Sequence, residues 1–154
     1  MKFDSLLGNA LVALQFGLMA AVAWWAAPFF LHFQAPLVAW GVGLGAAALG
    51  VWALSANRPG NFNIRPTPKP GAQFVQTGPY RWIRHPMYSS VLLAALAGLY
   101  GVDVGHRPAV GSAFFALAAV LWFKAGLEER WMVAQHPGYA DYIKTTRRFI
   151  PWLV

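Results

Sequence analysis

Long apolar runs alternate with short polar segments along this chain, and the pattern predicts a bundle of membrane-spanning helices. Four apolar stretches lie at about 6–31, 37–56, 86–101 and 109–123; the first is interrupted by Gln15 and closed by Pro28. An apolar run of about 18 residues is long enough to cross the hydrocarbon core as a helix. We therefore expect an all-α membrane protein with about four transmembrane helices, formed by residues 1–154 as a single domain.

Two polar stretches interrupt the apolar pattern. Residues 57–85 form a loop whose first part is rich in proline and basic residues, and such a long loop is either a lid over a binding site or a linker. Residues 126–154 form a C-terminal segment that mixes charges with large apolar side chains, which favours an interfacial helix over about 127–136. We expect His136-Pro137-Gly138 to end that helix, and Tyr139 and Tyr142 indicate another short one.

The distribution of lysine and arginine predicts how the helices are oriented. The loop after the second apolar stretch carries Arg58, Arg65, Lys69, Arg81 and Arg84, and the C-terminal part carries Lys124, Arg130, Lys144, Arg147 and Arg148. On the opposite side, the connections carry Arg107 alone. The positive-inside rule then places both termini and both polar stretches in the cytoplasm.

The composition narrows the functional classes. The chain is 58% hydrophobic and 11% charged, against about 45–50% and about 25% in soluble domains. In so apolar a chain, a net charge of +7 is best explained by cytoplasmic loops near anionic lipid headgroups, not by nucleic acid. The absence of cysteine excludes thiolate sites, and the spacing of the histidines predicts no metal. We expect an integral protein of the bacterial inner membrane.

Two further motifs favour structural interpretations. Gly41 and Gly45 form a small-xxx-small pair that lets a neighbouring helix approach, whereas a dinucleotide-binding loop would need a preceding strand. Ser89 and Ser90 lack the acid–histidine arrangement of a serine hydrolase.

The stretch from Gly78 to Tyr88 is the first candidate site. Pro86 suits the first turn of a helix, which makes His85 the N-cap of the third apolar helix. The free amides of that turn, together with Arg84 and His85, would form an anion-binding corner, and Tyr88 lies on the same helix face as His85. Taken alone, the cations are also explained as the usual basic flank of a span.

Glu128 and Glu129 form the second candidate site. Their default interpretation is an exposed helix-end ion pair, because Lys124 lies four residues before Glu128. However, they fall on the same predicted membrane face as Arg84 and His85. A zwitterionic ligand would use both signs of charge.

Taken together, the motifs resemble a known family. They are Gly78-Pro79-Tyr80-Arg81, Arg84-His85-Pro86-Met87-Tyr88, Glu128-Glu129, Tyr139-x-x-Tyr142 and Arg148-Phe149-Ile150-Pro151. The pattern, which covers about 57–151, resembles the integral-membrane methyltransferases that include isoprenylcysteine carboxyl methyltransferase and phospholipid N-methyltransferases.

The resemblance implies S-adenosylmethionine as the cofactor, bound at the cytoplasmic side. By position, His85 and Tyr88 would hold its carboxylate, with Arg84 and Pro86 shaping that corner. Glu128 and Glu129 would serve its amino or ribose side. The family usually has glycine where this chain has Ser90, a difference that bears on how closely the cofactor or a neighbouring helix approaches.

The resemblance leaves the methyl acceptor open among a carboxylate, an amine and a thiol on a lipidic or small hydrophobic molecule. A carboxylate would be neutralised by Arg147 or Arg148, whereas an amine or thiol would need a base such as Glu128, Glu129 or a tyrosine. The alternative function is a non-catalytic membrane module that binds anionic lipid or a protein partner through its basic cytoplasmic face.

Overall fold

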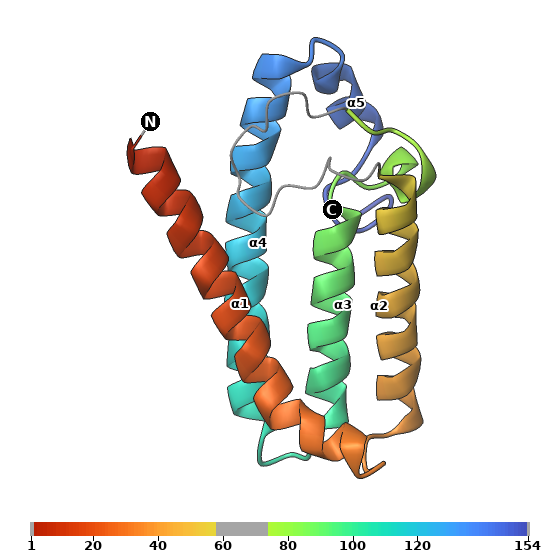
Figure 1. Ribbon diagram of the computed structural model, residues 1–154. Helices are drawn as coiled ribbons and strands as arrows, with labels where there is room; N and C mark the ends of the chain where they lie inside the picture. Colours follow the sequence, from red (N-terminus) through yellow and green to blue (C-terminus); the bar gives the residue numbers. More distant parts are fainter. Residues whose placement is uncertain (1, 58–73, 154) are drawn as a thin grey trace.

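The described part of the chain is a helical bundle. The computed structural model describes residues 2–57 and 74–153. Its elements are α1 (Lys2–Leu31), α2 (Leu37–Ala56), the short 3₁₀ helix η1 (Gly78–Arg81), α3 (Pro86–Gly101), α4 (Arg107–Gln135) and α5 (Tyr139–Thr145). The helices α1 to α4 run lengthwise through the bundle, and α5 caps one end (Figure 1). The all-helical fold class is confirmed for this part.

Three of the helices are long and apolar enough to cross a membrane: residues Leu6–Leu31 of α1, the whole of α2, and α4. By contrast, α3 has 16 residues and is about 24 Å long, shorter than the hydrocarbon core of about 30 Å. The bundle therefore contains three candidate spans and one shorter apolar helix. Large apolar side chains such as Trp24, Leu44 and Phe115 are exposed on its surface, which suits helices surrounded by lipid.

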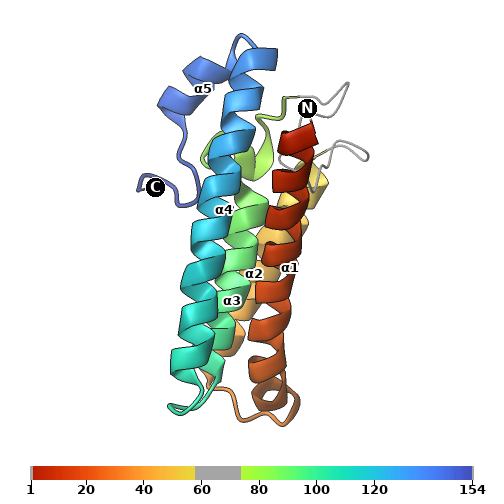
Figure 2. The ribbon, with the colours of Figure 1, turned by 90° about the vertical axis from the view of Figure 1, so that its left-hand side faces the viewer.

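The two polar stretches meet at one end of the bundle. The end of α2, the start of α3, the end of α4 and α5 lie at this end, and the start of α1 points to the same end but diverges from the other helices (Figures 1 and 2). The connections at 32–36 and 102–106 lie at the opposite end (Figure 1). Most of the predicted loop, with its lid and linker alternatives and residues Arg58, Arg65 and Lys69, lies outside the described residues.

The fourth helix differs from its prediction. A span ending at about 123 and a separate interfacial helix over 127–136 are wrong, because α4 continues unbroken from Arg107 to Gln135. Lys124, predicted in an exposed ion pair, is instead buried and donates a 2.5 Å hydrogen bond to Oε1 of Gln15 on α1. With that cation satisfied inside the bundle, no break is needed. The two glutamates therefore lie on a rigid helix.

The first helix ends where the apolar pattern predicts, one turn after Pro28. Pro28 lies inside α1, which ends at Leu31. Proline removes a donor but keeps its carbonyl, and the Pro28 carbonyl still accepts a 3.0 Å bond from the His32 amide. Pro28 therefore lies in the last turn of the helix, and the predicted end at residue 31 is confirmed.

Close packing on two sides holds α3 in the bundle. At Gly98, an added Cβ would lie 2.8 Å from Val22 on α1. On the other side, the Ser90 hydroxyl donates a 2.8 Å bond to the Ala46 carbonyl of α2, and an added Cβ at Gly50 would lie 2.8 Å from that same hydroxyl. Ser90, which replaces the glycine usual in the resembling family, thus faces α2 and is accommodated by Gly50.

This contact predicts a coupling between the two residues. Alanine is favoured over glycine in a helix by about 1 kcal/mol. In the parent protein, however, Gly50→Ala must displace the Ser90 hydroxyl and its hydrogen bond, at a cost of about 1 kcal/mol. We expect Gly50→Ala to be less favourable in the parent than in a Ser90→Ala background by about 1 kcal/mol, measured as a double-mutant cycle of unfolding free energies. Additive effects would contradict this packing.

Candidate active site

The C-terminal segment folds back along the residues that precede α3. Ile83 and Arg147 form an isolated parallel bridge. The Arg84 amide donates to the Arg147 carbonyl at 2.7 Å, and the His85 amide donates to the Arg148 carbonyl at 3.1 Å. Successive residues of an extended chain face opposite sides. Accordingly Arg148 turns inward, whereas the side chain of Arg147 is exposed.

Three side-chain hydrogen bonds anchor the C-terminal segment, including α5. Ser89 on α3 donates to the Phe149 carbonyl at 2.6 Å. The Arg84 guanidinium donates to the Thr146 carbonyl at 2.6 Å. From α5, the Tyr142 hydroxyl donates to the Tyr80 carbonyl at 2.6 Å. The first two bonds hold residues 146–149 beside the start of α3, and the third joins α5 to η1.

Glu129 is the centre of a buried ionic cluster. Its Oε1 accepts from Nε of Arg84 at 2.8 Å and lies 3.2 Å from Nε2 of His85. Arg148 donates from Nη2 to Oε2 at 2.5 Å and from Nε to Oε1 at 3.2 Å. The Glu129 side chain is 9% exposed, and that of Arg84 is 10% exposed. Glu129 thus connects α4, the start of α3 and the C-terminal segment.

His85 bridges the two glutamates. Its Nδ1 lies 3.4 Å from Oε2 of Glu128, and its Nε2 faces Glu129. An imidazole donates from both nitrogens only when it is protonated. Burial alone would lower the pKa of His85, but the hydrogen bonds and charges of Glu128 and Glu129 outweigh burial and raise the pKa above its ordinary value of 6.5. The geometry favours an imidazolium here.

Tyr88 completes the cluster on the side of Glu128. Its hydroxyl donates to Oε1 of Glu128 at 2.5 Å, and its ring stacks on His85 with centroids 5.4 Å apart. Glu128 keeps a side-chain exposure of 22%, more than twice that of Glu129. Of the two adjacent carboxylates, Glu128 is therefore the more accessible to a ligand.

The structure brings together most of the predicted site residues. Six of them form what is called the polar cluster below: Arg84, His85, Tyr88, Glu128, Glu129 and Arg148. Pro86 is buried in the first turn of α3, as predicted, with His85 as the N-cap residue. Arg147 points away from the cluster. The cations that the sequence predicts as an anion corner contact the chain's own carboxylates in this structure.

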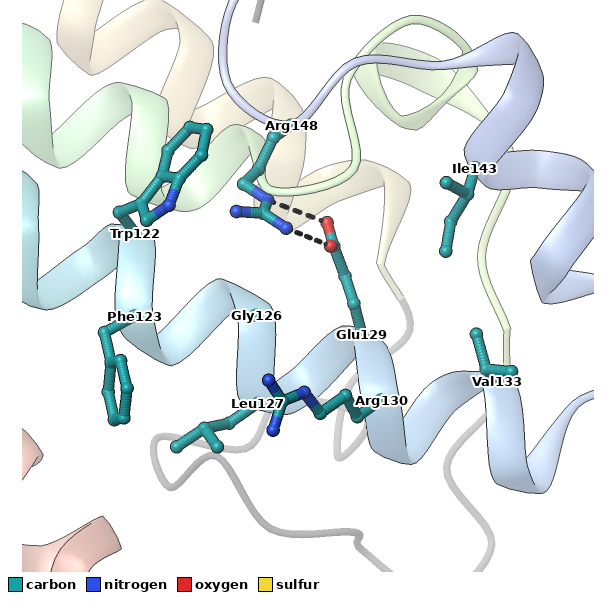
Figure 3. Close-up of a pocket in the computed structure, with 9 residues that line it drawn as sticks. All are labelled: Trp122, Phe123, Gly126, Leu127, Glu129, Arg130, Val133, Ile143 and Arg148. Atoms are coloured by element: carbon teal, nitrogen blue, oxygen red, sulfur yellow. Dashed lines mark hydrogen bonds and ion pairs between the residues drawn. The ribbon is translucent and has the colours of Figure 1, made fainter.

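A cavity borders the cluster along α4. It has a volume of about 580 Å³ and is lined by Trp122, Phe123, Gly126, Leu127, Glu129, Arg130, Val133, Ile143 and Arg148. Figure 3 shows the side chains of Glu129 and Arg148 pointing toward each other, with Trp122 beside the arginine. The Arg148 guanidinium lies 4.3 Å from the centre of the Trp122 ring. The cavity thus combines charged groups with an apolar wall.

Sequence reasoning missed several residues of this site. Trp122 carried a usable signal, because a residue seven positions before Glu129 lies on the same helix face. Thr146 and the Ser89 hydroxyl gave none, since both act through the backbone of a segment distant in sequence. The hydrogen bond between Lys124 and Gln15, which are 109 positions apart, could not be predicted from the sequence pattern either.

The bundle and the polar cluster define a helical membrane protein with a charged site at one end. The profile of the isoprenylcysteine carboxyl methyltransferase (ICMT) family matches residues 37–135, more than half of the chain. The chain therefore belongs to this family. The matched region includes Arg84 and both glutamates, whereas Arg148 lies beyond it. Family membership supports a membrane methyltransferase.

A curated relative adds little about function. The chain is 33% identical over 81 residues to the cobalt-zinc-cadmium resistance protein CzcN of Cupriavidus metallidurans. The alignment covers 51% of this chain and 36% of that relative. The chain therefore matches only about a third of the relative's length, and the likeness carries no argument about substrate.

Proposed function

We propose that this protein transfers a methyl group from S-adenosylmethionine to a lipophilic acceptor at the polar cluster. The observation that carries the proposal is the convergence of the family's residues: Arg84, His85, Tyr88, Glu128 and Glu129 contact one another beside a cavity of about 580 Å³. Small-molecule sites commonly have volumes of about 300–1,000 Å³. The positive-inside distribution of lysine and arginine supports a cytoplasmic position for this end.

The residues present fit the charges of this cofactor. With His85 protonated, the cluster has three cations, Arg84, His85 and Arg148, against the carboxylates Glu128 and Glu129. One positive charge is left over, which suits the cofactor's carboxylate. The accessible oxygens of Glu128 suit its ammonium group or ribose hydroxyls. Trp122 and the aliphatic wall of the cavity offer an apolar surface for the adenine.

The chain's own contribution to the reaction is positioning. S-adenosylmethionine supplies a sulfonium-bound methyl group that a nucleophile takes by in-line displacement, without a covalent enzyme intermediate. The protein must hold donor and acceptor in line and keep water from between them. Glu128 and Glu129 lie on the rigid helix α4, and the anchored C-terminal segment fixes Arg148. Both features suit that task.

The acceptor sets the remaining residue roles. A carboxylate acceptor needs no base and is neutralised by Arg147, which is exposed beside the cluster, or by Arg148. An amine or thiol acceptor passes its proton to a base, for which Glu128 is the accessible candidate. The exposed apolar surface of the surrounding helices favours an acceptor dissolved in the membrane.

Ligand-dependent thermal stability tests the proposal. S-adenosylhomocysteine, the product form of the donor, should raise the unfolding temperature of the purified protein in detergent; at 100 times its Kd the stabilisation is about 2.7 kcal/mol. His85→Ala and Glu129→Ala should abolish this stabilisation. Tyr88→Phe, which keeps the ring but removes the bond to Glu128, should weaken donor binding more than it changes the KM for the acceptor.

His106→Ala is the matched control, because His106 lies at the opposite end of the bundle beside Asp103 and should leave the stabilisation intact. No effect of S-adenosylhomocysteine on the parent protein, or equal effects in all variants, would overturn the methyltransferase proposal. Binding to anionic vesicles that depends on salt alone would then favour the lipid-binding module.

A separate experiment identifies the acceptor. Membranes are incubated with methyl-labelled donor, and the label is tested for being base-labile, lipid-extractable or volatile.

A further inference from the structure

Lys124 is a buried cation within a candidate membrane span. Its side chain is 1% exposed, and it lies on α4 at the level where α1 and α3 pack against that helix. A charge in this position is costly unless it is paired, and an apolar residue of similar volume is often as stable or more so. The stability of the bundle therefore does not explain why a lysine occupies this position.

The contacts of Lys124 lead directly to the polar cluster. Its Nζ donates to Oε1 of Gln15 at 2.5 Å and lies 5.2 Å from the centre of the Tyr88 ring. An ammonium within about 6 Å of an aromatic ring is attracted to its face. The hydroxyl of that ring donates to Glu128, which lies one helical turn after Lys124. Gln15 and Tyr88 thus hold the ammonium between α1 and α3.

We propose that Lys124, held by Gln15, is a positioning residue that fixes the Tyr88 ring so that its hydroxyl donates to Glu128. The ammonium attracts the ring from within the bundle while the carboxylate of Glu128 accepts from its outer end. Tyr88 is thereby held at both ends. The Glu128 oxygen that accepts from Tyr88 is thereby kept in one position, where a ligand can contact this carboxylate.

This role makes α1 part of the site. Gln15 is itself buried and lies outside the region matched by the family profile, which begins at residue 37. Its amide oxygen accepts from Lys124 without neutralising the charge. A glutamate at this position would pair with the ammonium and draw it away from Tyr88.

Fluorine NMR tests the positioning role without any ligand. The five tyrosines are replaced biosynthetically by 3-fluorotyrosine, and the Tyr88 signal is assigned by its loss in Tyr88→Phe. Lys124→Met, which keeps the volume without the charge, should shift or broaden the Tyr88 signal, and Lys124→Arg should restore it in part. Leu117→Met is the control, because Leu117 is a fully buried residue of the same helix about two turns away. An unchanged Tyr88 signal in Lys124→Met overturns the proposal.

Donor affinity provides the second measurement, which rests on the proposed function. Lys124→Met and Gln15→Glu should weaken S-adenosylhomocysteine binding about tenfold, the loss expected for one disturbed charge-assisted hydrogen bond, while both proteins remain folded. A lysine that serves only packing would be at least as well satisfied by Glu at position 15, and affinity would not change. A shifted Tyr88 signal with parent-like affinity therefore overturns the positioning role. If the parent itself does not bind, the proposed function fails, and the Tyr88 signal still decides whether Lys124 orients that ring.

Discussion

Glu129→Gln is expected to cost about 3–5 kcal/mol of unfolding free energy, the usual loss when one partner of a buried ion pair is removed. The carboxylate of Glu129 is shared by Arg84, His85 and Arg148. A glutamine of the same shape removes the counter-charge that Arg84 and Arg148 share, leaves His85 with Glu128 alone, and turns its amide group toward one of the three cations. Because these residues join α4, the start of α3 and the C-terminal segment, the loss should loosen the whole charged end. Thermal or denaturant unfolding in detergent measures it.

Two comparisons isolate the cause. Arg147→Ala, which removes an exposed arginine next to Arg148, should change stability little. The double variant Glu129→Gln with Arg148→Gln should lose less unfolding free energy than the sum of the two single variants, because the second substitution removes a cation that the first leaves without its counter-charge. Additive losses, or equal losses in Arg147→Ala and Arg148→Ala, would contradict the central role of Glu129.

The pH dependence of the same variant gives an independent check through His85. The raised pKa means that protonated His85 stabilises the folded state fully below its ordinary value of 6.5. That contribution is lost as pH rises through the folded-state pKa. The parent should therefore lose stability over this window, and the loss should be smaller in Glu129→Gln, where one of the two carboxylates that raise the pKa is gone.

The sequence predicts the elements of this protein better than their contacts. Apolar runs identified the helices, and Pro86 identified the first turn of α3, because both signals are local. The error at Lys124 shows the limit of this reasoning. A lysine near the end of an apolar run normally reaches water, and nothing local indicates that Gln15 would receive it inside the bundle.

The candidate site shows the same limit. The residue types and their common end follow from motif and charge distribution, but their pairing does not. Arg84 and Arg148 were expected to await an external anion, whereas in this structure both bind Glu129. That pairing depends on the bridge between Ile83 and Arg147, a contact between segments 64 positions apart. The extended backbone at this bridge also explains why two adjacent arginines differ, because it turns the side chain of Arg148 inward and that of Arg147 outward.

Neutralising each of the two adjacent glutamates should have a different effect, on ligand affinity for Glu128 and on stability for Glu129. Glu128→Gln is expected to lower the affinity for S-adenosylhomocysteine about tenfold or more, because a charge-assisted hydrogen bond contributes about 1.5–3 kcal/mol. Its effect on unfolding should be small, since its side chain is 22% exposed and a glutamine oxygen still accepts from Tyr88. Glu129→Gln should instead lower mainly the free energy of unfolding. Isothermal titration calorimetry on folded protein, paired with thermal unfolding of both variants, separates these outcomes. If Glu128→Gln unfolds as early as Glu129→Gln, Glu128 belongs to the structural core of the cluster. If Glu128→Gln binds the ligand like the parent, the ligand binds elsewhere.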